Sequence, residues 1–244
     1  MALDRQHFTS SLTKIFNENG LSKLLSKEVC EKLYTLTEFM LSENEKYNLT
    51  AITDPDKITL NHYADCATLA VRLPKGARVC DIGCGAGFPT LPVAIFRPDL
   101  TVFGVDSTAK RIGYVTQAAA LLGLSNVECA TMRAEDGGRD PKFREKFDVV
   151  TARAVAELRI LAELCLPYAR VGGSFIAMKG KNAEYELSSA KKSISMLGGR
   201  NVRTEMITLV GGETISHPLI FIDKKEKTPQ NYPRPYAQIS KKPL

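Results

Sequence analysis

A glycine-rich turn and one acidic residue beyond it have the residue types and spacing needed to bind a nucleoside. The turn is DIGCGAGFP at residues 81–89, directly after a strand-like run and directly before a helical pattern. Glycines let the backbone approach a ligand closely, and a helix that begins beyond them directs unpaired N–H groups at it. Asp106 ends the next strand-like run, where a carboxylate can accept hydrogen bonds from both hydroxyls of a ribose.

The spacing of the glycines separates two classes of cofactor that use such a turn. Dinucleotide-binding turns follow the pattern G-x-G-x-x-G. Counted from Gly83, Phe88 replaces the third glycine, and counted from Gly85 no third glycine follows. The pattern D-x-G-x-G-x-G suits S-adenosylmethionine, because a nucleoside joined to an amino acid has no pyrophosphate to be seated. The spacing therefore favours S-adenosylmethionine, with a dinucleotide site and a purely structural turn as the alternatives.

Charged residues also follow two further strand-like runs. Glu135 and Asp136 lie just beyond the run at 126–131, and Arg153 ends the run at 147–153. Ligands of open α/β sheets bind at the carboxyl ends of the strands. Either Glu135 or Asp136 could read an adenine edge, and a solvated loop acid is the alternative. Arg153 faces the same crevice, although its type and position alone slightly favour a structural salt bridge.

The sequence lacks the motifs of two kinds of base methylation. Methylation of exocyclic amino groups commonly uses a turn with a Pro-Pro pair, and carbon-5 methylation uses a Pro-Cys nucleophile; the chain contains neither. A ring nitrogen with a free lone pair, such as N7 of guanine, needs positioning but no proton abstraction. The histidines His7, His62 and His217 are scattered, so we predict neither a metal site nor a catalytic base. His62 could face the crevice, but a structural role is the stronger expectation.

The elements that must position these residues follow from the hydrophobic pattern. Residues 1–70 have apolar positions at helical spacing, and from Ala77 short strand-like runs alternate with helical patterns. This alternation predicts an α/β fold, an open and mostly parallel sheet with helices on both faces. Two consecutive strand-like runs, 201–210 and 217–225, predict an antiparallel hairpin at one sheet edge. We expect a helical segment at 1–70, a main domain at 71–224, and a basic, proline-rich tail at 225–244 that is extended over the surface.

Composition and charge restrict the class of protein. The chain has 244 residues, 44% of them hydrophobic, enough to form a core without disulfides, and its six cysteines are spread singly. No apolar run reaches the roughly 20 residues of a membrane span, so we expect a cytoplasmic protein. Residues 1–165 carry 20 Lys and Arg against 21 Asp and Glu, whereas residues 166–244 carry 13 against 6. This asymmetry indicates a polyanionic partner, nucleic acid before a membrane surface, or else a solubilising tail.

The chain resembles the bacterial 16S rRNA guanine-N7 methyltransferases, also called the glucose-inhibited division protein B family. Segments in family order carry the resemblance: YNLTAI at 47–52, NHYADC at 61–66, DIGCGAGFP at 81–89, VDSTAKR at 105–111, RAE at 133–135, ARAVAEL at 152–158, MKG at 178–180, YPR at 232–234 and KKPL at 241–244. The chain departs from the family pattern at four positions: Asn61, Cys66, Ala237 and Ile239.

The resemblance implies a Rossmann-like class I methyltransferase with a seven-stranded sheet and S-adenosylmethionine as cofactor. The residues expected at the cofactor are Gly83, Gly85, Phe88, Asp106, Ala134, Glu135 and Arg153. The residues expected at RNA are His62, Lys179, Arg234 and Lys241.

The resemblance also implies a substrate, the guanine at conventional position 527 of 16S rRNA. The expected partner is that RNA, as free rRNA, an assembly intermediate or the small ribosomal subunit, with no membrane and with a monomeric enzyme. A small-molecule methyltransferase and a non-catalytic rRNA-binding assembly factor on the same fold are the alternatives.

Overall fold

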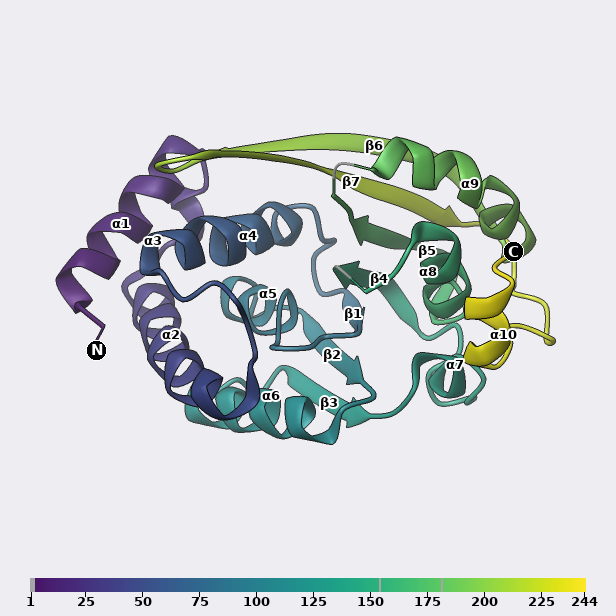
Figure 1. The fold of residues 1–244 in the computed structure, drawn as a ribbon, viewed down its shortest axis with the longest axis horizontal. Helices are drawn as coiled ribbons and strands as arrows, with labels where there is room; N and C mark the ends of the chain where they lie inside the picture. The colour runs from purple at the N-terminus through teal and green to yellow at the C-terminus, as the bar shows by residue number, and fades with distance from the viewer. Residues whose placement is uncertain (1–2, 154, 181) are drawn as a thin grey trace.

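A single sheet runs through the computed structural model, which describes residues 3–153, 155–180 and 182–244. Within the described residues the sheet has seven strands in the order β3-β2-β1-β4-β5-β7-β6 (Figure 1). Their bounds are β1 Arg78–Ile82, β2 Thr101–Asp106, β3 Val127–Thr131, β4 Phe147–Arg153, β5 Ala169–Met178, β6 Gly199–Val210 and β7 Thr214–Lys224. The first five strands in this order pair in parallel, and β7 is antiparallel to both β5 and β6. The predicted parallel sheet with an antiparallel hairpin at its edge is therefore confirmed.

Helices cover both faces of the sheet, because alternate residues of each strand point to opposite sides. Val79 of β1 belongs to the hydrophobic cluster that includes α5 (Thr90–Phe96) and α6 (Ala109–Leu121). Its neighbour Cys80 belongs to the cluster on the other face, with α8 (Leu158–Cys165) and α9 (Ala183–Met196). Both residues are buried. The strands are thus covered on both sides, as a parallel sheet requires.

The first seventy residues form helices that pack into the cluster on the α5 side. They are α1 (Arg5–Glu18), the 3-10 turn η1 (Ser22–Leu24), α2 (Lys27–Tyr47), α3 (Pro55–Ile58), the π-helical turn η2 (Thr59–Ala64) and α4 (Asp65–Ala70). The side chains of Asp4, Ser26 and Asp54 accept backbone N–H groups at the starts of α1, α2 and α3.

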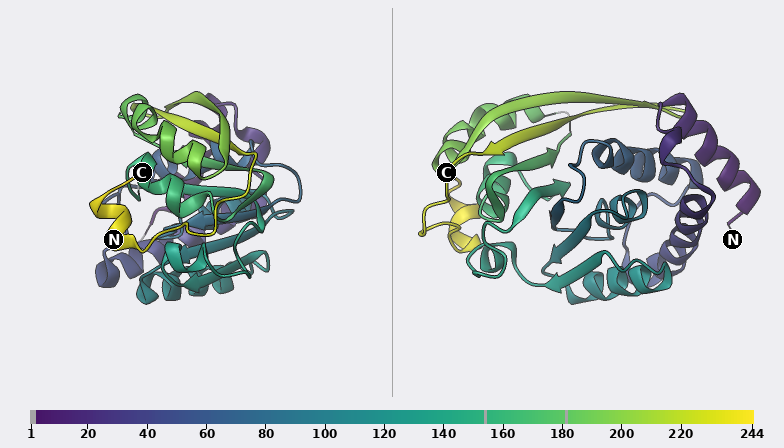
Figure 2. Two further views of the ribbon diagram at one scale, coloured as in Figure 1. Left: turned by 90° about the vertical axis from the view of Figure 1, so that its right-hand side faces the viewer. Right: turned by 180° about the vertical axis from the view of Figure 1, so that it is seen from behind.

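The β6–β7 hairpin is long enough to join the two ends of the molecule. Its turn reaches the N-terminal helices, far from α9, in both front and rear views (Figures 1 and 2). There the side-chain amide of Asn19 donates to the carbonyl oxygen of Val210 at 2.7 Å and accepts the Val210 N–H at 2.9 Å. Asn61 donates to the carboxylate of Glu213, on the hairpin turn, at 3.2 Å. The hairpin therefore ties the sheet edge to the helical segment.

One local expectation was wrong, and one short helix was not expected. The C-terminal tail is not extended throughout, because it ends in the helix α10 (Tyr236–Lys241), where Ile239 is fully buried in the α8 cluster. Helix α8 ends at Cys165, two residues before Pro167, and β5 begins at Ala169. The short helix α7 (Ala134–Gly137) had no sequence signal of its own.

No helix in the described part of the chain is long and apolar enough to cross a membrane. The same residues contain no group of three or more His, Cys, Asp or Glu side chains that could hold a metal ion.

Candidate functional site

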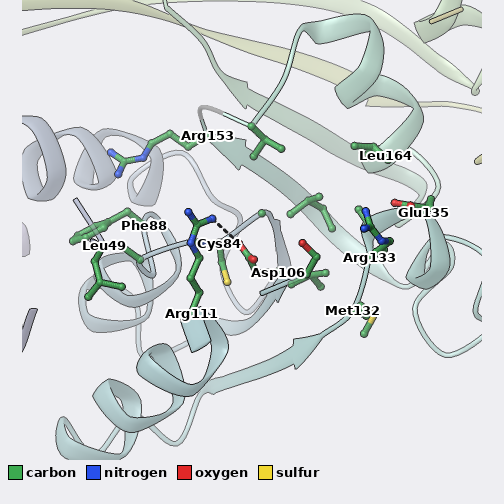
Figure 3. A pocket seen from close by; sticks show the side chains of 18 of the residues that line it. Leu49, Cys84, Phe88, Asp106, Arg111, Met132, Arg133, Glu135, Arg153 and Leu164 are labelled. Carbon is green, nitrogen blue, oxygen red and sulfur yellow. Dashed lines mark hydrogen bonds and ion pairs between the residues drawn. The ribbon is translucent and has the colours of Figure 1, made fainter. Parts of the chain in front are cut away.

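A cavity of about 540 Å³ opens at the carboxyl ends of the parallel strands, within the size range of small-molecule sites. All seven residues predicted at the cofactor line it: Gly83, Gly85, Phe88, Asp106, Ala134, Glu135 and Arg153. Figure 3 shows that the cavity is elongated, with Phe88, Leu49 and Arg153 at one end and Glu135 and Leu164 at the other. Asp106 lies between these ends (Figure 3). The topology therefore brings residues from segments far apart in the sequence to one elongated site.

The glycine-rich turn bends sharply between β1 and α5. Gly83 has φ +74°, a conformation that side chains rarely adopt, and a Cβ atom there would lie 2.6 Å from Cγ2 of Val155. The N–H groups of Gly83 and Cys84 donate to the carbonyl oxygen of Val105 at 2.7 and 3.0 Å. These hydrogen bonds hold the turn at the end of β2. The glycines of the turn place no side chain in the cavity.

Asp81, the first residue of the turn motif, holds the turn from the protein interior and does not line the cavity. Its carboxylate is buried and accepts the hydroxyls of Thr90 at 2.7 Å and Thr151 at 3.0 Å. Burial raises the pKa of Asp81 to about 6, and the two threonine hydrogen bonds limit the rise. Asp81 therefore joins the start of α5 to β4.

The acid after β2, Asp106, has its carboxylate at the middle of the cavity. One oxygen accepts the N–H of Gly85 at 3.0 Å, and the other accepts the N–H of Thr108 at 2.8 Å. Arg111 lies 3.7 Å from Oδ2 (Figure 3). Each carboxylate oxygen has more than one lone pair, so both can still accept a hydrogen bond from a ligand. This arrangement suits the predicted binding of two ribose hydroxyls.

The two candidates for reading an adenine edge are separated by their burial. Glu135 is 7% exposed and lines the cavity, whereas Asp136 is exposed and does not line it. Among the described residues the Glu135 carboxylate accepts no hydrogen bond. At the cavity, this buried acceptor therefore has no partner from the described part of the chain. The hydroxyl of Tyr168 donates to the carbonyl oxygen of Ala134 at 2.8 Å and holds α7 in place.

Arg153 joins the opposite end of the cavity to the helical segment. Its guanidinium lies 5.4 Å from the centre of the Phe88 ring and donates to the carboxylate of Asp65 at 3.2 Å. The other oxygen of Asp65 lies 2.6 Å from Nε2 of His217. Burial lowers the pKa of His217, but its contact with Asp65 prevails and raises the pKa above the usual value. Arg153 thus forms a salt bridge, with Asp65, as one interpretation of the sequence expected, and this salt bridge lies in the wall of the cavity.

His62 stacks on the Phe88 ring, with the ring centres 4.4 Å apart and the planes inclined by 24°. Its Nε2 lies 3.2 Å from the hydroxyl of Thr50, and its Nδ1 lies 3.1 Å from the carbonyl oxygen of Asn61. Burial, and then the charge of Arg153, lower the pKa of His62 to about 4. The imidazole is therefore neutral near pH 7 and adds no positive charge to this end of the cavity.

The depressed pKa of His62 should appear in the pH dependence of stability. Between its folded pKa of about 4 and its usual value of 6.5, the unfolded chain binds a proton that the folded protein does not, so His62 destabilises the fold as pH falls through this range. The variant His62→Gln lacks this penalty. We expect its free energy of unfolding relative to wild type to rise by about 3 kcal/mol between pH 7 and pH 4, measured by urea denaturation.

The raised pKa of Asp81 acts in the opposite direction, since a carboxyl that is protonated in the fold stabilises it as pH falls below about 6. It does so in wild type and variant alike, so the difference between the two curves isolates His62. Parallel curves from pH 7 to pH 4 would contradict the prediction.

The other residues predicted at RNA lie outside the cavity. Lys179 is 9% exposed, and its ammonium donates to the carbonyl oxygen of Ala156 and contacts Glu186, each at 2.7 Å. Arg234 holds its guanidinium on the buried Glu163, and Lys241 is exposed on α10. A role of these three residues in RNA binding stays a prediction.

Several residues that line the cavity were not identified from the sequence. They are Leu49 and Thr50 before α3, Val155 after β4, Leu164 of α8 and Tyr236 of α10. Leu49 and Thr50 lie in the segment YNLTAI and Val155 lies in ARAVAEL, and the match of these segments to the family was the available signal. Tyr236 carried no signal, because the tail was expected to be extended over the surface.

Comparisons with known proteins place this geometry among methyltransferases. A family model described as rRNA small subunit methyltransferase G matches residues 29–212. A protein named ribosomal RNA small subunit methyltransferase G from Lactobacillus delbrueckii subsp. bulgaricus is 45% identical over 218 residues, which are 88% of this chain and 91% of the relative. A protein of the same name from Exiguobacterium sibiricum is 41% identical over 244 residues, 99% of this chain and 100% of the relative.

Solved structures give the same fold at low sequence identity. A SAM-dependent O-methyltransferase of Thermotoga maritima aligns with a TM-score of 0.54 and 16% identity, over 77% of this chain and 72% of its own. A SAM-dependent methyltransferase of Aquifex aeolicus aligns with a TM-score of 0.51 and 19% identity, over 74% of this chain and 97% of its own. The predicted Rossmann-like methyltransferase fold is confirmed.

Proposed function

The chain belongs to the rRNA small subunit methyltransferase G family, and from this premise we propose that it methylates N7 of a guanine in the 16S rRNA of the small ribosomal subunit, with S-adenosylmethionine as methyl donor. The observation that supports this assignment is the elongated cavity, whose two ends have different chemistry. A buried carboxylate is at one end, and an aromatic ring with a guanidinium is at the other.

The residues of the cavity fit the three parts of the cofactor. Glu135, a buried acceptor without a partner from the described chain, can take a hydrogen bond from the adenine amino group. Asp106 can accept the ribose hydroxyls, and the turn at Gly83 leaves space for the backbone to approach the amino-acid part. When bound, S-adenosylmethionine supplies an electrophilic methyl group. A nucleoside with an amino-acid extension thus spans the cavity from Glu135 to Phe88.

The acceptor base belongs at the Phe88 end, where aromatic and cationic side chains gather. The Phe88 ring, with His62 stacked on it, offers an apolar wall at which a guanine can be held. Arg153 can donate to the base, and Asp65 balances its positive charge. N7 carries a free lone pair and loses no proton when a methyl group is added, so the residues here need to position the base, not to deprotonate it. A neutral His62 tolerates the positive charge that develops on the methylated base.

The excess of positive charge after residue 165 supports a polyanionic substrate, because cationic side chains neutralise phosphates. His62 is the RNA candidate that we place nearest to the base, since it lines the cavity. Lys179, Arg234 and Lys241 remain candidates for contacts along the RNA outside the cavity.

The proposed reaction is tested by chemical cleavage of rRNA. Borohydride followed by aniline breaks RNA at N7-methylguanine, so 16S rRNA from cells with the gene should be cleaved at conventional position 527 and rRNA from cells lacking it should not. Complementation with wild type should restore the cleavage, whereas Arg153→Met should not. The same cleavage pattern with and without the gene would refute the activity, and methylation of small molecules without RNA would support the small-molecule alternative.

A further inference from the structure

The C-terminal segment, which we define as residues 225–244, contributes one residue to the lining of the cavity. Tyr236, the first residue of α10, lines the cavity although it is 39% exposed. Helix α10 packs on α8, and α8 packs on α7. Leu164 of α8 and Glu135 of α7 lie together at one end of the cavity (Figure 3). Tyr236 therefore belongs to the same end as Glu135.

A buried ion pair holds this segment two residues before Tyr236. The guanidinium of Arg234 donates to both carboxylate oxygens of Glu163, at 2.8 Å from Nε and 2.6 Å from Nη2. The backbone N–H of Arg234 donates to the same carboxylate at 2.8 Å. The Glu163 side chain is fully buried on α8, and the Arg234 side chain is 20% exposed. A bidentate pair with a third hydrogen bond fixes position and orientation together.

Two arginines bind backbone carbonyls of the segment, and Lys224 contacts one of its side chains. Arg144 donates to the carbonyl oxygens of Tyr232 at 2.8 Å and Thr228 at 2.7 Å. Arg139 donates to the carbonyl oxygen of Pro233 at 2.6 Å. Lys224, fully buried at the end of β7, contacts the hydroxyl of Thr228. These contacts fix the segment to the main domain.

The segment also packs directly on α7, the helix that carries Ala134 and Glu135. A Cβ atom at Gly138, the residue that ends α7, would lie 3.1 Å from Cγ of Pro233. The hydroxyl of Tyr168 holds α7 through Ala134. Helix α7 thus has the segment as one of its supports, and Ile239 anchors the segment in the α8 cluster.

We propose that the C-terminal segment is part of the cofactor site, with Tyr236 packing against the adenine of S-adenosylmethionine and the Arg234–Glu163 pair positioning it. The proposal rests on the cofactor of the proposed function and not on its RNA substrate. Stacking of an aromatic side chain on a base contributes enough affinity for about a tenfold change on truncation. A segment whose positive charge indicated RNA binding thus has a role in cofactor binding.

Calorimetric titration of the full-length protein with S-adenosylmethionine, without RNA, tests the role of Tyr236. We expect Tyr236→Ala to weaken binding about tenfold and Tyr236→Phe to bind like wild type, because the ring and not the hydroxyl makes the contact. Gln238→Ala, an exposed change on the same helix, is the control and should bind like wild type. Unchanged affinity in Tyr236→Ala would overturn the proposal.

A second ligand, 5′-methylthioadenosine, shows which part of the cofactor the ring contacts. It keeps the adenosine and lacks the amino acid, so Tyr236→Ala should weaken its binding by the same factor. A loss confined to S-adenosylmethionine would place the ring at the amino-acid part and overturn the adenine contact.

The positioning role of Arg234 is tested by kinetics as well as by binding. We expect Arg234→Met to raise the KM for S-adenosylmethionine about tenfold and to leave kcat unchanged, a split that a general loss of folded protein would not produce. The double variant Glu163→Gln/Arg234→Met removes the unpaired buried carboxylate and should show the same loss.

Cofactor affinity equal to wild type in this double variant would overturn the positioning role, and so would an effect on RNA affinity alone. Wild-type protein that binds S-adenosylmethionine but leaves N7 unmethylated would refute the proposed function and leave this inference standing.

Discussion

Gly83→Ala should reduce the affinity for S-adenosylmethionine at least about 100-fold. The added Cβ would lie 2.6 Å from Cγ2 of Val155, a branched side chain that also lines the cavity. The φ of +74° adds a backbone cost of about 1 to 2 kcal/mol for a residue with a side chain. Either the turn or Val155 must move, and both form the wall against which the amino-acid part is expected to bind. Calorimetric titration of the purified variant measures the loss.

Gly113→Ala is the matched control for this change. Gly113 lies within α6, and a Cβ atom there would have no neighbour within 4 Å. Alanine is favoured over glycine in a helix by roughly 0.5 to 1 kcal/mol, so the control should bind S-adenosylmethionine like wild type and unfold at a slightly higher temperature. A Gly83→Ala variant that binds as tightly as the control would show that the turn tolerates a side chain, contrary to our interpretation.

Arg153→Met should have the largest effect on methylation, a decrease in kcat of about 100-fold or more. The change removes the guanidinium that lies over Phe88 and joins it to Asp65 and the carbonyl oxygen of Asn61. Asp65 is left with its contact to Nε2 of His217. Loss of one partner from a buried pair costs about 3 to 5 kcal/mol. Because Arg153 is partly exposed, we expect the decrease in the free energy of unfolding to be near the lower end of that range. Single-turnover methylation of rRNA and urea denaturation measure the two effects.

Two further variants separate positioning from stability. Asp65→Asn/Arg153→Met removes the unpaired carboxylate and should recover part of the stability without recovering methylation. Arg159→Met removes a nearby surface pair with Glu157, in which both side chains are more than a third exposed. Exposed pairs contribute little, so this control should match wild type in both measurements. Recovery of methylation in the double variant would show that Arg153 acts only through the fold.

Much of the cofactor site was predictable because its signals are local. The glycines of the turn, Asp106 and Arg153 each end or follow a strand, and strands with this alternation form a parallel sheet. In such a sheet the carboxyl ends meet at one edge, so Gly83, Asp106 and Glu135 had to lie close together once the strands were identified. All seven residues expected at the cofactor line the cavity, but Phe88, Ala134 and the cofactor role of Arg153 were expected from the family resemblance and not from local signals.

The tertiary structure alone decided which side chains complete the site. Asp65 and Arg153 are 88 positions apart in the chain, and Arg234 and Glu163 are 71 apart. Contacts of this kind depend on how helices pack and on the order of the strands, which a one-dimensional pattern does not record. Tyr236 shows the consequence most clearly, because a proline-rich basic tail has the composition of an extended chain. The buried carboxylate of Glu163 and the apolar surface of α8 nonetheless bind this tail, since a carboxylate buried without a partner would be costly.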